Sequence, residues 1–560
     1  KITMKHIKLI AAVAFTGLLL SGCKKYLDVN SDPASPQSPD IGSLFAPVTG
    51  TMSAMMLISP ITAGQYTQNW SSTVGGDNWD VHGGNAGGVL AIGLWRQFYA
   101  QPGASINLVI KKGIIEEKWD YVGAAIALRA WGLQQTTDYF GPMPFYQAWD
   151  NTRTTYAYDA QETIYKIIDS LCHVSLSYLS RTDGASNQST MSRGDQVYKG
   201  DRTKWSKFVY GLLARNWHRR TNKADYNADS VIYYVDKSFA SNADNFYVVH
   251  SATRNDDTNP AGPARDNFTT RRQSRFIVQL LDGTNFYGNT LPASRDPRIR
   301  GMLSVSPDTS TTTTNMPAQN GGYRYLIPGA GDPNAGALPV NNPVTLLPTN
   351  PLFRQRPSTP YGDSAITNLA IANFTISTGK YLFQNKREFP IMTYHELQFI
   401  KAEAAFRKDD KSMAATAYRL GITNTFDFIN FFNTSAPNVS AIPFAQRDAY
   451  MSSAAVKDAA TITLTDIMLQ KYIGDWGWNL IESWADMRRY HYFDTDPLTG
   501  AQVYRGYALT IFSSNNQGPK PAYRYRPTNF SEYDWNLEEL RKIGVLNVDY
   551  HTYEMWFSQP

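Results

Sequence analysis

The chain has 560 residues, of which 42% are hydrophobic and 13% aromatic, and it carries a formal net charge of +5. This length allows a large core, and so small a charge excludes the concentrated basic surface that nucleic-acid binding requires. The two cysteines, Cys23 and Cys172, are too few for a zinc site built on cysteine ligands.

The N-terminal segment predicts export. Lys5 and Lys8 precede an apolar stretch at residues 10–20, which is about half of the roughly 20 residues that a bilayer span requires, so residues 1–22 are typical of a signal peptide. Leu20-Ser21-Gly22-Cys23 resembles a bacterial lipobox, which implies cleavage before Cys23 and lipid on that cysteine. The mature chain then carries a net charge of +2, because Lys1, Lys5 and Lys8 are removed.

Residues 23–44 predict a lipidated tether. The segment is polar, and its prolines, among them Pro33 and Pro36, favour an extended chain leading away from the lipid. Lys24 occupies the position at which a lipoprotein retained in the inner membrane often carries aspartate, so the outer membrane is the expected destination. Beyond the signal peptide we expect no membrane span.

The rest of the chain predicts a mainly α fold. Apolar residues recur at helical spacing in several stretches, and Asp201 is a plausible cap for one of them. The predicted helices are Phe45–Ile58, Leu94–Lys112, Trp119–Phe140, Gln161–Leu179, Thr203–Thr221, Ile391–Arg407, Met413–Phe432 and Leu464–Tyr490. Their lengths and short connections favour stacked tetratricopeptide-like helix pairs, although no 34-residue repeat is visible.

Residues 255–387 differ in composition from the helical stretches on either side. Gly, Pro, Asn, Ser and Thr dominate them, which indicates a functional segment, disorder or short elements that the sequence does not resolve. Because helices flank this segment, we interpret residues 45–560 as one domain with long irregular loop insertions.

A search for catalytic and metal-binding residues favours structural interpretations. His395-Glu396 has Phe399 where a second zinc ligand would stand, and His218 is interpreted as a cation at a helix end. The carboxylates considered as a glycosidase pair favour solvated or ion-paired helix faces; they are Glu396, Glu403, Asp475, Glu482 and Asp486. We therefore predict no catalytic residue, no metal and no cofactor.

Several sequence blocks, taken in order, resemble the SusD/RagB family of outer-membrane lipoproteins of Bacteroidetes. The blocks are Leu20–Cys23 with Tyr26–Asp28, Asp138–Pro144, Tyr158–Tyr165, Tyr198–Trp205, Phe389–Ala404, and Gln470–Tyr472 with Glu482–Arg489. One block alone is weak, whereas the ordered set from Cys23 to about Tyr490 is specific.

This resemblance implies a lipid-anchored protein at the cell surface that binds nutrients and covers a SusC-like TonB-dependent transporter. The family binds glycans in most members and peptides in some. Three hypotheses therefore stand: a glycan-binding lipoprotein that delivers oligosaccharide to the transporter, a peptide-binding lipoprotein, and a surface hydrolase. The hydrolase hypothesis requires two isolated carboxylates that face one pocket.

Two sets of residues are candidates for the ligand contacts. A glycine-rich loop carries Trp70, Asp77, Asn78 and Trp79, which combine aromatic faces with polar groups as sugar binding requires, in a region through which the family often binds glycans. The loop-rich insertion carries a second set, Tyr323, Tyr325 and Tyr361. Trp95 and Trp131 fall within predicted helices and are expected to be core residues.

Overall fold

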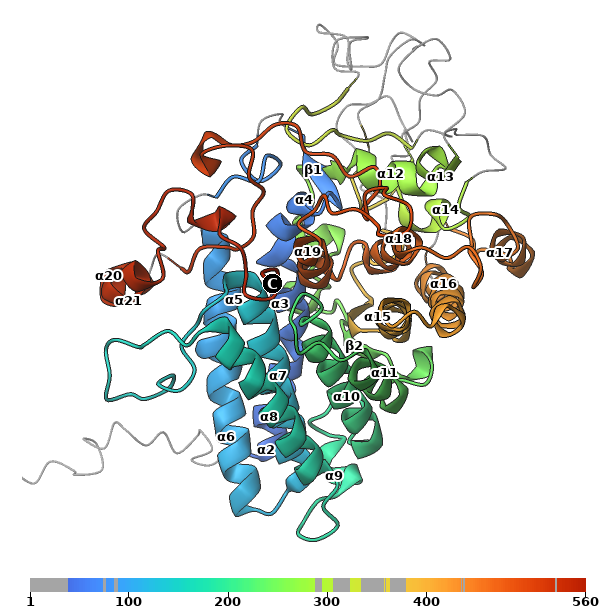
Figure 1. Cartoon of the computed structure of the whole chain (residues 1–560). Coiled ribbons are helices and arrows are strands. Elements are labelled where there is room, and N and C mark those ends of the chain that lie inside the picture. Colours follow the sequence, from blue (N-terminus) through green and yellow to red (C-terminus); the bar gives the residue numbers. More distant parts are fainter. Residues whose placement is uncertain are drawn as a thin grey trace, which may run out of the picture.

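The computed structural model describes most of the chain and is mainly helical (Figure 1). The described residues are 39–73, 77–84, 89–287, 295–305, 323–333, 357, 359–362, 379–434, 436, 439–528 and 531–560. The predicted signal peptide and the predicted lipidation at Cys23 lie outside these residues.

Helices of two kinds and two small sheets make up the fold. The longer helices are α2 (Ile41–Gly50), α5 (Val89–Tyr99), α6 (Gln101–Ile115), α7 (Trp119–Phe140), α8 (Gln161–Leu179), α10 (Arg202–His218), α11 (Ala228–Lys237), α15 (Tyr394–Arg407), α16 (Lys411–Asn433), α17 (Phe444–Met451), α18 (Leu464–Asp475) and α19 (Leu480–Arg489). Shorter helical segments are α3 (Met52–Leu57), η2 (Pro60–Thr62), α4 (Ala63–Tyr66), α9 (Gln188–Met191), α12 (Arg275–Leu281), α13 (Thr284–Tyr287), α14 (Ile299–Met302), α20 (Glu532–Trp535) and α21 (Leu537–Lys542). Strand β1 (Trp70–Ser72) pairs antiparallel with β3 (Arg271–Gln273), and β2 (Phe246–Val249) pairs antiparallel with β4 (Glu388–Met392).

Neighbouring helices form the scaffold in pairs. Helix α7 packs on α8, α8 on α10, α10 on α11, α11 on α15 and α15 on α16, so that the pairs follow one another across the molecule (Figure 1). Trp119 at the start of α7 stacks on Tyr178 at the end of α8, while Tyr165 near the start of α8 donates a hydrogen bond to Asp138 near the end of α7. These two helices are therefore antiparallel. The mainly α, tetratricopeptide-like architecture is confirmed.

Small residues let α7 and α8 approach closely. A Cβ atom added at Gly123 would lie 2.6 Å from Cγ of Leu179, and the Gly123 carbonyl accepts a hydrogen bond of 2.7 Å from the Ser175 hydroxyl. Trp131 on the same helix and Trp95 on α5 are buried, as predicted. The cap of α10 is confirmed as well, because the Asp201 carboxylate accepts from the amides of Thr203 and Lys204.

The structure corrects two boundaries of the predicted elements and shows short elements in the loop-rich segment, one of the alternatives left open by the sequence. Helix α2 begins at Ile41, so the predicted tether of residues 23–44 ends before its last four residues. The stretch predicted as one helix over Leu464–Tyr490 is divided into α18 and α19, because the chain turns at Trp476–Asn479 with Gly477 at a φ of +88°. The loop-rich segment 255–387 contains, in its described part, β3 and the short helices α12, α13 and α14.

One stretch, Ile41–Tyr66, has the length and the apolar composition of a membrane span, contrary to the expectation of none beyond the signal peptide. In the structure it is divided into α2, α3, η2 and α4, and 56% of its apolar window is buried inside the protein. Phe45 and Met56 have no exposed surface. These helices are therefore part of the hydrophobic core of the fold.

A network of buried charges joins the helices at the centre of the scaffold. Its members are 0–2% exposed. The ion pairs are Arg215–Glu396 at 2.6 Å, Arg219–Asp138 at 2.8 Å, Arg219–Glu482, Lys471–Glu482 at 3.0 Å, Lys471–Asp486 at 2.7 Å, Arg489–Glu403 at 2.7 Å and Arg489–Asp486 at 2.6 Å. The ion pairs expected for Glu396 and Glu403 are present, but these side chains are buried and not solvated.

His218 is a neutral member of this network and not the helix-end cation that the sequence favours. Its Nε2 lies 2.8 Å from Glu403, and burial lowers the pKa of its imidazole to about 4, although the Glu403 charge acts in the opposite direction. Burial and the neighbouring Glu396 raise the pKa of Asp475 well above its ordinary value. The network thus holds a neutral imidazole beside its ion pairs.

We expect Arg219→Met to destabilise the protein by about 3–5 kcal/mol, because it leaves the buried carboxylates of Asp138 and Glu482 without their shared cation. The free energy of unfolding in urea measures the loss. The matched control is Arg153→Met, whose ion pair with Asp150 is exposed and screened by solvent, so its loss is expected to cost far less. Equal losses in the two variants would contradict the role of the network.

Candidate ligand-binding surface

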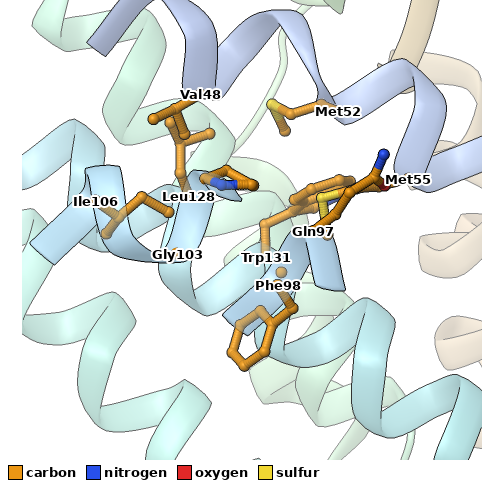
Figure 2. A pocket seen from close by; sticks show the side chains of 11 residues that line it. Val48, Met52, Met55, Gln97, Phe98, Gly103, Ile106, Leu128 and Trp131 are labelled. Carbon is orange, nitrogen blue, oxygen red and sulfur yellow. The ribbon is translucent and has the colours of Figure 1, made fainter. Parts of the chain in front are cut away.

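An apolar cavity between α2, α5, α6 and α7 is too small for a nutrient (Figure 2). Its volume is about 20 Å³, which is room for about one water molecule. Val48, Met52 and Phe98 are among its lining side chains. Ligand capture therefore requires another surface.

The two candidate sets, far apart in the sequence, meet at one small sheet. Trp70 pairs with Gln273 across β1 and β3. On the other side of β3, the amide of Leu326 donates to the carbonyl of Gln273 at 3.1 Å, and the amide of Arg275 donates to the carbonyl of Leu326 at 2.9 Å. Residues 70–72 and 323–327 thus flank the same strand.

Three of the seven candidate residues are buried there. Trp70 has 0% exposed surface; its indole N–H donates to the Ile61 carbonyl at 2.8 Å and its ring packs edge-on against Phe268. Tyr361 packs against the same phenylalanine and accepts a hydrogen bond from its amide, while burial raises the pKa of Tyr361 to about 12. Tyr323 is buried as well, whereas Tyr325 is half-buried. Trp70, Tyr323 and Tyr361 therefore support the loops from within.

Trp79 is the outer ring of an aromatic stack. It is half-buried and stacks on Tyr525, with ring centroids 5.2 Å apart and an angle of 14° between the planes. Tyr525 in turn stacks on Tyr139 of α7 at 4.8 Å and 20°. The indole N–H of Trp79 makes no hydrogen bond within the described part of the chain. Its position thus leaves an aromatic face or edge and a donor at the surface.

Asp77 and Asn78 form the turn that presents Trp79. The Asp77 carboxylate accepts from the Trp79 amide at 2.8 Å and from Gln65 at 3.2 Å, and the carbonyl of Asn78 accepts from the Gly83 amide at 2.5 Å. A Cβ atom at position 83 would lie 2.7 Å from that carbonyl, so glycine is required. Asn78, the residue before Trp79, is exposed.

His82 fastens this turn to the C-terminal part of the chain. Its Nδ1 accepts from the Ala522 amide at 3.0 Å, and its Nε2 lies 3.0 Å from the Tyr66 carbonyl and from the Tyr507 hydroxyl. Since Nδ1 accepts, the proton of the neutral ring is on Nε2. Burial lowers the pKa of His82 to about 3.

Asp80 brings a buried carboxyl to the base of the turn. It accepts from Gln65 at 2.6 Å and from the Ser72 amide at 2.9 Å. Burial raises its pKa to about 6, and the Asp77 charge acts in the same direction. Burial lowers the pKa of the Arg271 guanidinium, and the charges of Asp77 and Asp80 act in the opposite direction. The turn is thus held by polar groups beneath an aromatic surface.

Sequence reasoning missed Tyr525, His82 and Asp80 as parts of this surface. Tyr525 lies in an irregular segment with no periodicity, and its partner Tyr139 is almost 400 residues earlier. In the sequence, His82 lies between Trp79 and the glycine pair Gly83-Gly84. This position indicates a constrained turn, but it does not reveal the residues that His82 contacts. Within the described residues, no cluster of three or more His, Cys, Asp or Glu side chains is arranged to hold a metal ion.

A family model described as starch-binding and associating with the outer membrane matches residues 33–351 and 357–503. The chain belongs to the SusD-like family. The resemblance seen in the sequence blocks is confirmed, and with it membership of a family of nutrient-binding proteins associated with the outer membrane.

Solved structures of SusD-like proteins share the fold along nearly the whole chain. A SusD/RagB family protein from Bacteroides thetaiotaomicron is 20% identical with a TM-score of 0.66, covering 93% of this chain and 99% of its own. A SusD homologue from Bacteroides fragilis is 15% identical with a TM-score of 0.64, and a chitin-binding protein is 18% identical with a TM-score of 0.64; each covers 93% of this chain and 100% of its own. No curated protein sequence matches the chain.

The buried imidazole of His82 predicts a loss of stability in acid. Between about pH 6.5 and pH 3 the unfolded chain binds a proton at this position and the folded chain does not, so stability is full above this window and falls as the pH drops through it. Asp80 acts in the opposite direction between about pH 6 and pH 4, because its folded form holds the proton more tightly.

We expect His82→Asn to reduce stability at pH 7, since the bond to Tyr66 is lost, and to make the decline between pH 6.5 and pH 4 shallower. Asparagine keeps an acceptor for the Ala522 amide and tolerates the φ of +56° at this position. Urea unfolding at a series of pH values gives the slope. An unchanged slope would show that His82 does not titrate on unfolding.

Proposed function

We propose that the protein captures a glycan at the cell surface and delivers it to a SusC-like TonB-dependent transporter of the outer membrane. The observation that carries this proposal is the stack of Trp79 on Tyr525, which presents an aromatic ring beside polar groups. The fold and the family description, starch-binding and associating with the outer membrane, support it. So does the similarity in fold to a chitin-binding protein.

The chemistry of this surface suits an oligosaccharide. A sugar ring has an apolar face, which an aromatic ring covers, and a rim of hydroxyl groups, which side-chain amides and carboxylates satisfy. Trp79 supplies the ring, Asn78 is an exposed residue with a side-chain amide, and the Asp77 carboxylate accepts from the Trp79 backbone amide. Because Tyr525 already packs on Trp79, the ring is oriented before a ligand arrives, which reduces the entropy lost on binding. Tyr325, half-buried, is a further candidate contact.

The same proposal places lipid on Cys23 and the protein on the outer surface of the outer membrane. A single acyl chain gives marginal binding and two give stable anchoring, so the several chains of a bacterial lipoprotein would hold it there. Residues preceding α2 would then separate the anchor from the binding domain.

A hydrolase is less well supported. The carboxylates considered for catalysis, Glu396, Glu403 and Glu482 among them, are buried and engaged in ion pairs across the scaffold, so they face no surface at which a glycan is bound. Peptide capture stays the alternative, with extended chains bound through loop backbone and aromatic pockets.

We expect Trp79→Ala to weaken binding of maltoheptaose or chitohexaose by about tenfold, because the sugar loses its aromatic partner. Isothermal titration calorimetry gives the affinity, and circular dichroism confirms that the variant is folded. The matched control is Trp535→Ala, since Trp535 is 68% exposed on α20 and is not part of the stack.

Two results would count against the proposal. Equal affinity in Trp79→Ala and the unmodified protein removes this surface as the site. No signal on a glycan array, together with retention of peptides from a digest, replaces glycan capture by peptide capture.

A further inference from the structure

A second hollow lies on the outer side of the scaffold, between α15 and α16. Its volume is about 310 Å³, at the lower end of the range of about 300–1,000 Å³ that small-molecule sites occupy. Gln398 and Lys401 of α15 line it, as do Ser412 and Thr416 of α16. None of these residues belongs to the surface around Trp79.

Gln398 is the informative residue of this hollow. Its side chain is nine-tenths buried, with only 6% of the residue exposed, and it lines the hollow. It makes no hydrogen bond to any residue in the described ranges. The oxygen and nitrogen atoms of its amide are not enclosed, so they can bind water or a ligand in the hollow. The hollow therefore presents one free donor group and one free acceptor.

The charged groups at the hollow are already paired. Nζ of Lys401 lies 2.5 Å from the Asp236 carboxylate, which comes from α11. The Asp410 carboxylate caps α16 by accepting from the Met413 amide at 2.9 Å. A charged ligand would have to displace these partners, whereas a neutral one would not. The arrangement therefore favours a neutral ligand.

The uncharged lining residues include both polar and apolar groups. Thr416 donates to the Ser412 carbonyl at 2.9 Å, which leaves its oxygen lone pairs available. Met413 and Leu420, which is 41% exposed, supply apolar surface on α16. The hollow thus offers amide, hydroxyl and apolar groups together, which can contact the hydroxyl rim and the apolar face of a sugar ring.

We propose that this hollow is a second binding site, which takes a neutral polyhydroxylated ring such as a single sugar residue through Gln398 and Thr416. It shares with the proposed function only the class of ligand. Both helices belong to the rigid scaffold, so the site exists without the loops around Trp79. A polysaccharide held at both sites would leave more slowly than one held at either site alone, because the second contact is intramolecular.

The test uses the protein labelled with ¹³C at its methionine methyl groups, since Met413 lines the hollow. Its resonance is assigned with Met413→Leu and followed during titration with glucose, with N-acetylglucosamine and, as a zwitterion, with leucine. We expect a saturable shift with at least one of the two sugars and none with leucine. The affinity should fall about tenfold in Gln398→Leu and remain unchanged in Gln446→Leu, a control on the exposed face of α17.

Thr416→Val tests the same site in case Gln398→Leu does not fold. Thr416 is exposed and valine has nearly the same shape, so this variant is expected to fold. It should weaken the same shift severalfold. Trp79→Ala should leave the Met413 shift intact, which separates this site from the proposed glycan surface. The proposal is overturned if neither sugar moves the Met413 resonance, if leucine moves it equally, or if folded Gln398→Leu and Thr416→Val bind as the unmodified protein does.

Discussion

Burial of opposite charges at the centre of the helical scaffold is the constraint on which the rest of the structure depends. Arg219, which directly follows α10, joins Asp138 of α7 to Glu482 of α19, and Arg489 of α19 pairs with Glu403 of α15. Each charge placed there loses its hydration, so each must find its partner in one geometry. These pairs join helices that are hundreds of residues apart in the chain, and loss of one partner would leave the other as an unpaired buried charge.

The candidate binding surface is connected to that network through Tyr139 and Arg488. Tyr139, the inner ring of the aromatic stack, directly follows Asp138 in α7. Arg488 donates to the carbonyls of Asp138 and Tyr523 at 2.7 and 2.8 Å, so the segment that carries Tyr525 is tied to the same point. Trp79 then rests on Tyr525. A surface residue is thus connected to the rigid core through two stacked rings, an arrangement suited to a binding site that must keep its shape.

Local patterns predicted the scaffold well because helices are local structures. The spacing of apolar residues located α7, α8 and α10, and Asp201 marked the start of α10. The same patterns failed where the outcome depends on distant segments. Trp70 is a plausible ligand contact in its glycine-rich loop, yet Phe268 and the Ile61 carbonyl enclose it. Glu403 has the spacing of an exposed helix residue and pairs with Arg407 one turn later, but its fully buried cation, Arg489, lies 86 positions away. No short window of sequence contains Arg489 and Glu403 together.

The amide of Ala522 donates to His82, and the hydroxyl of Tyr507 donates to the Tyr66 carbonyl, so each contact joins segments more than 400 residues apart. The turn that carries Trp79 is synthesised early, whereas the segment that closes it is synthesised near the end of the chain. Until then the stacked partner of Trp79 is absent. The candidate surface is therefore complete only when nearly the whole chain is available to fold.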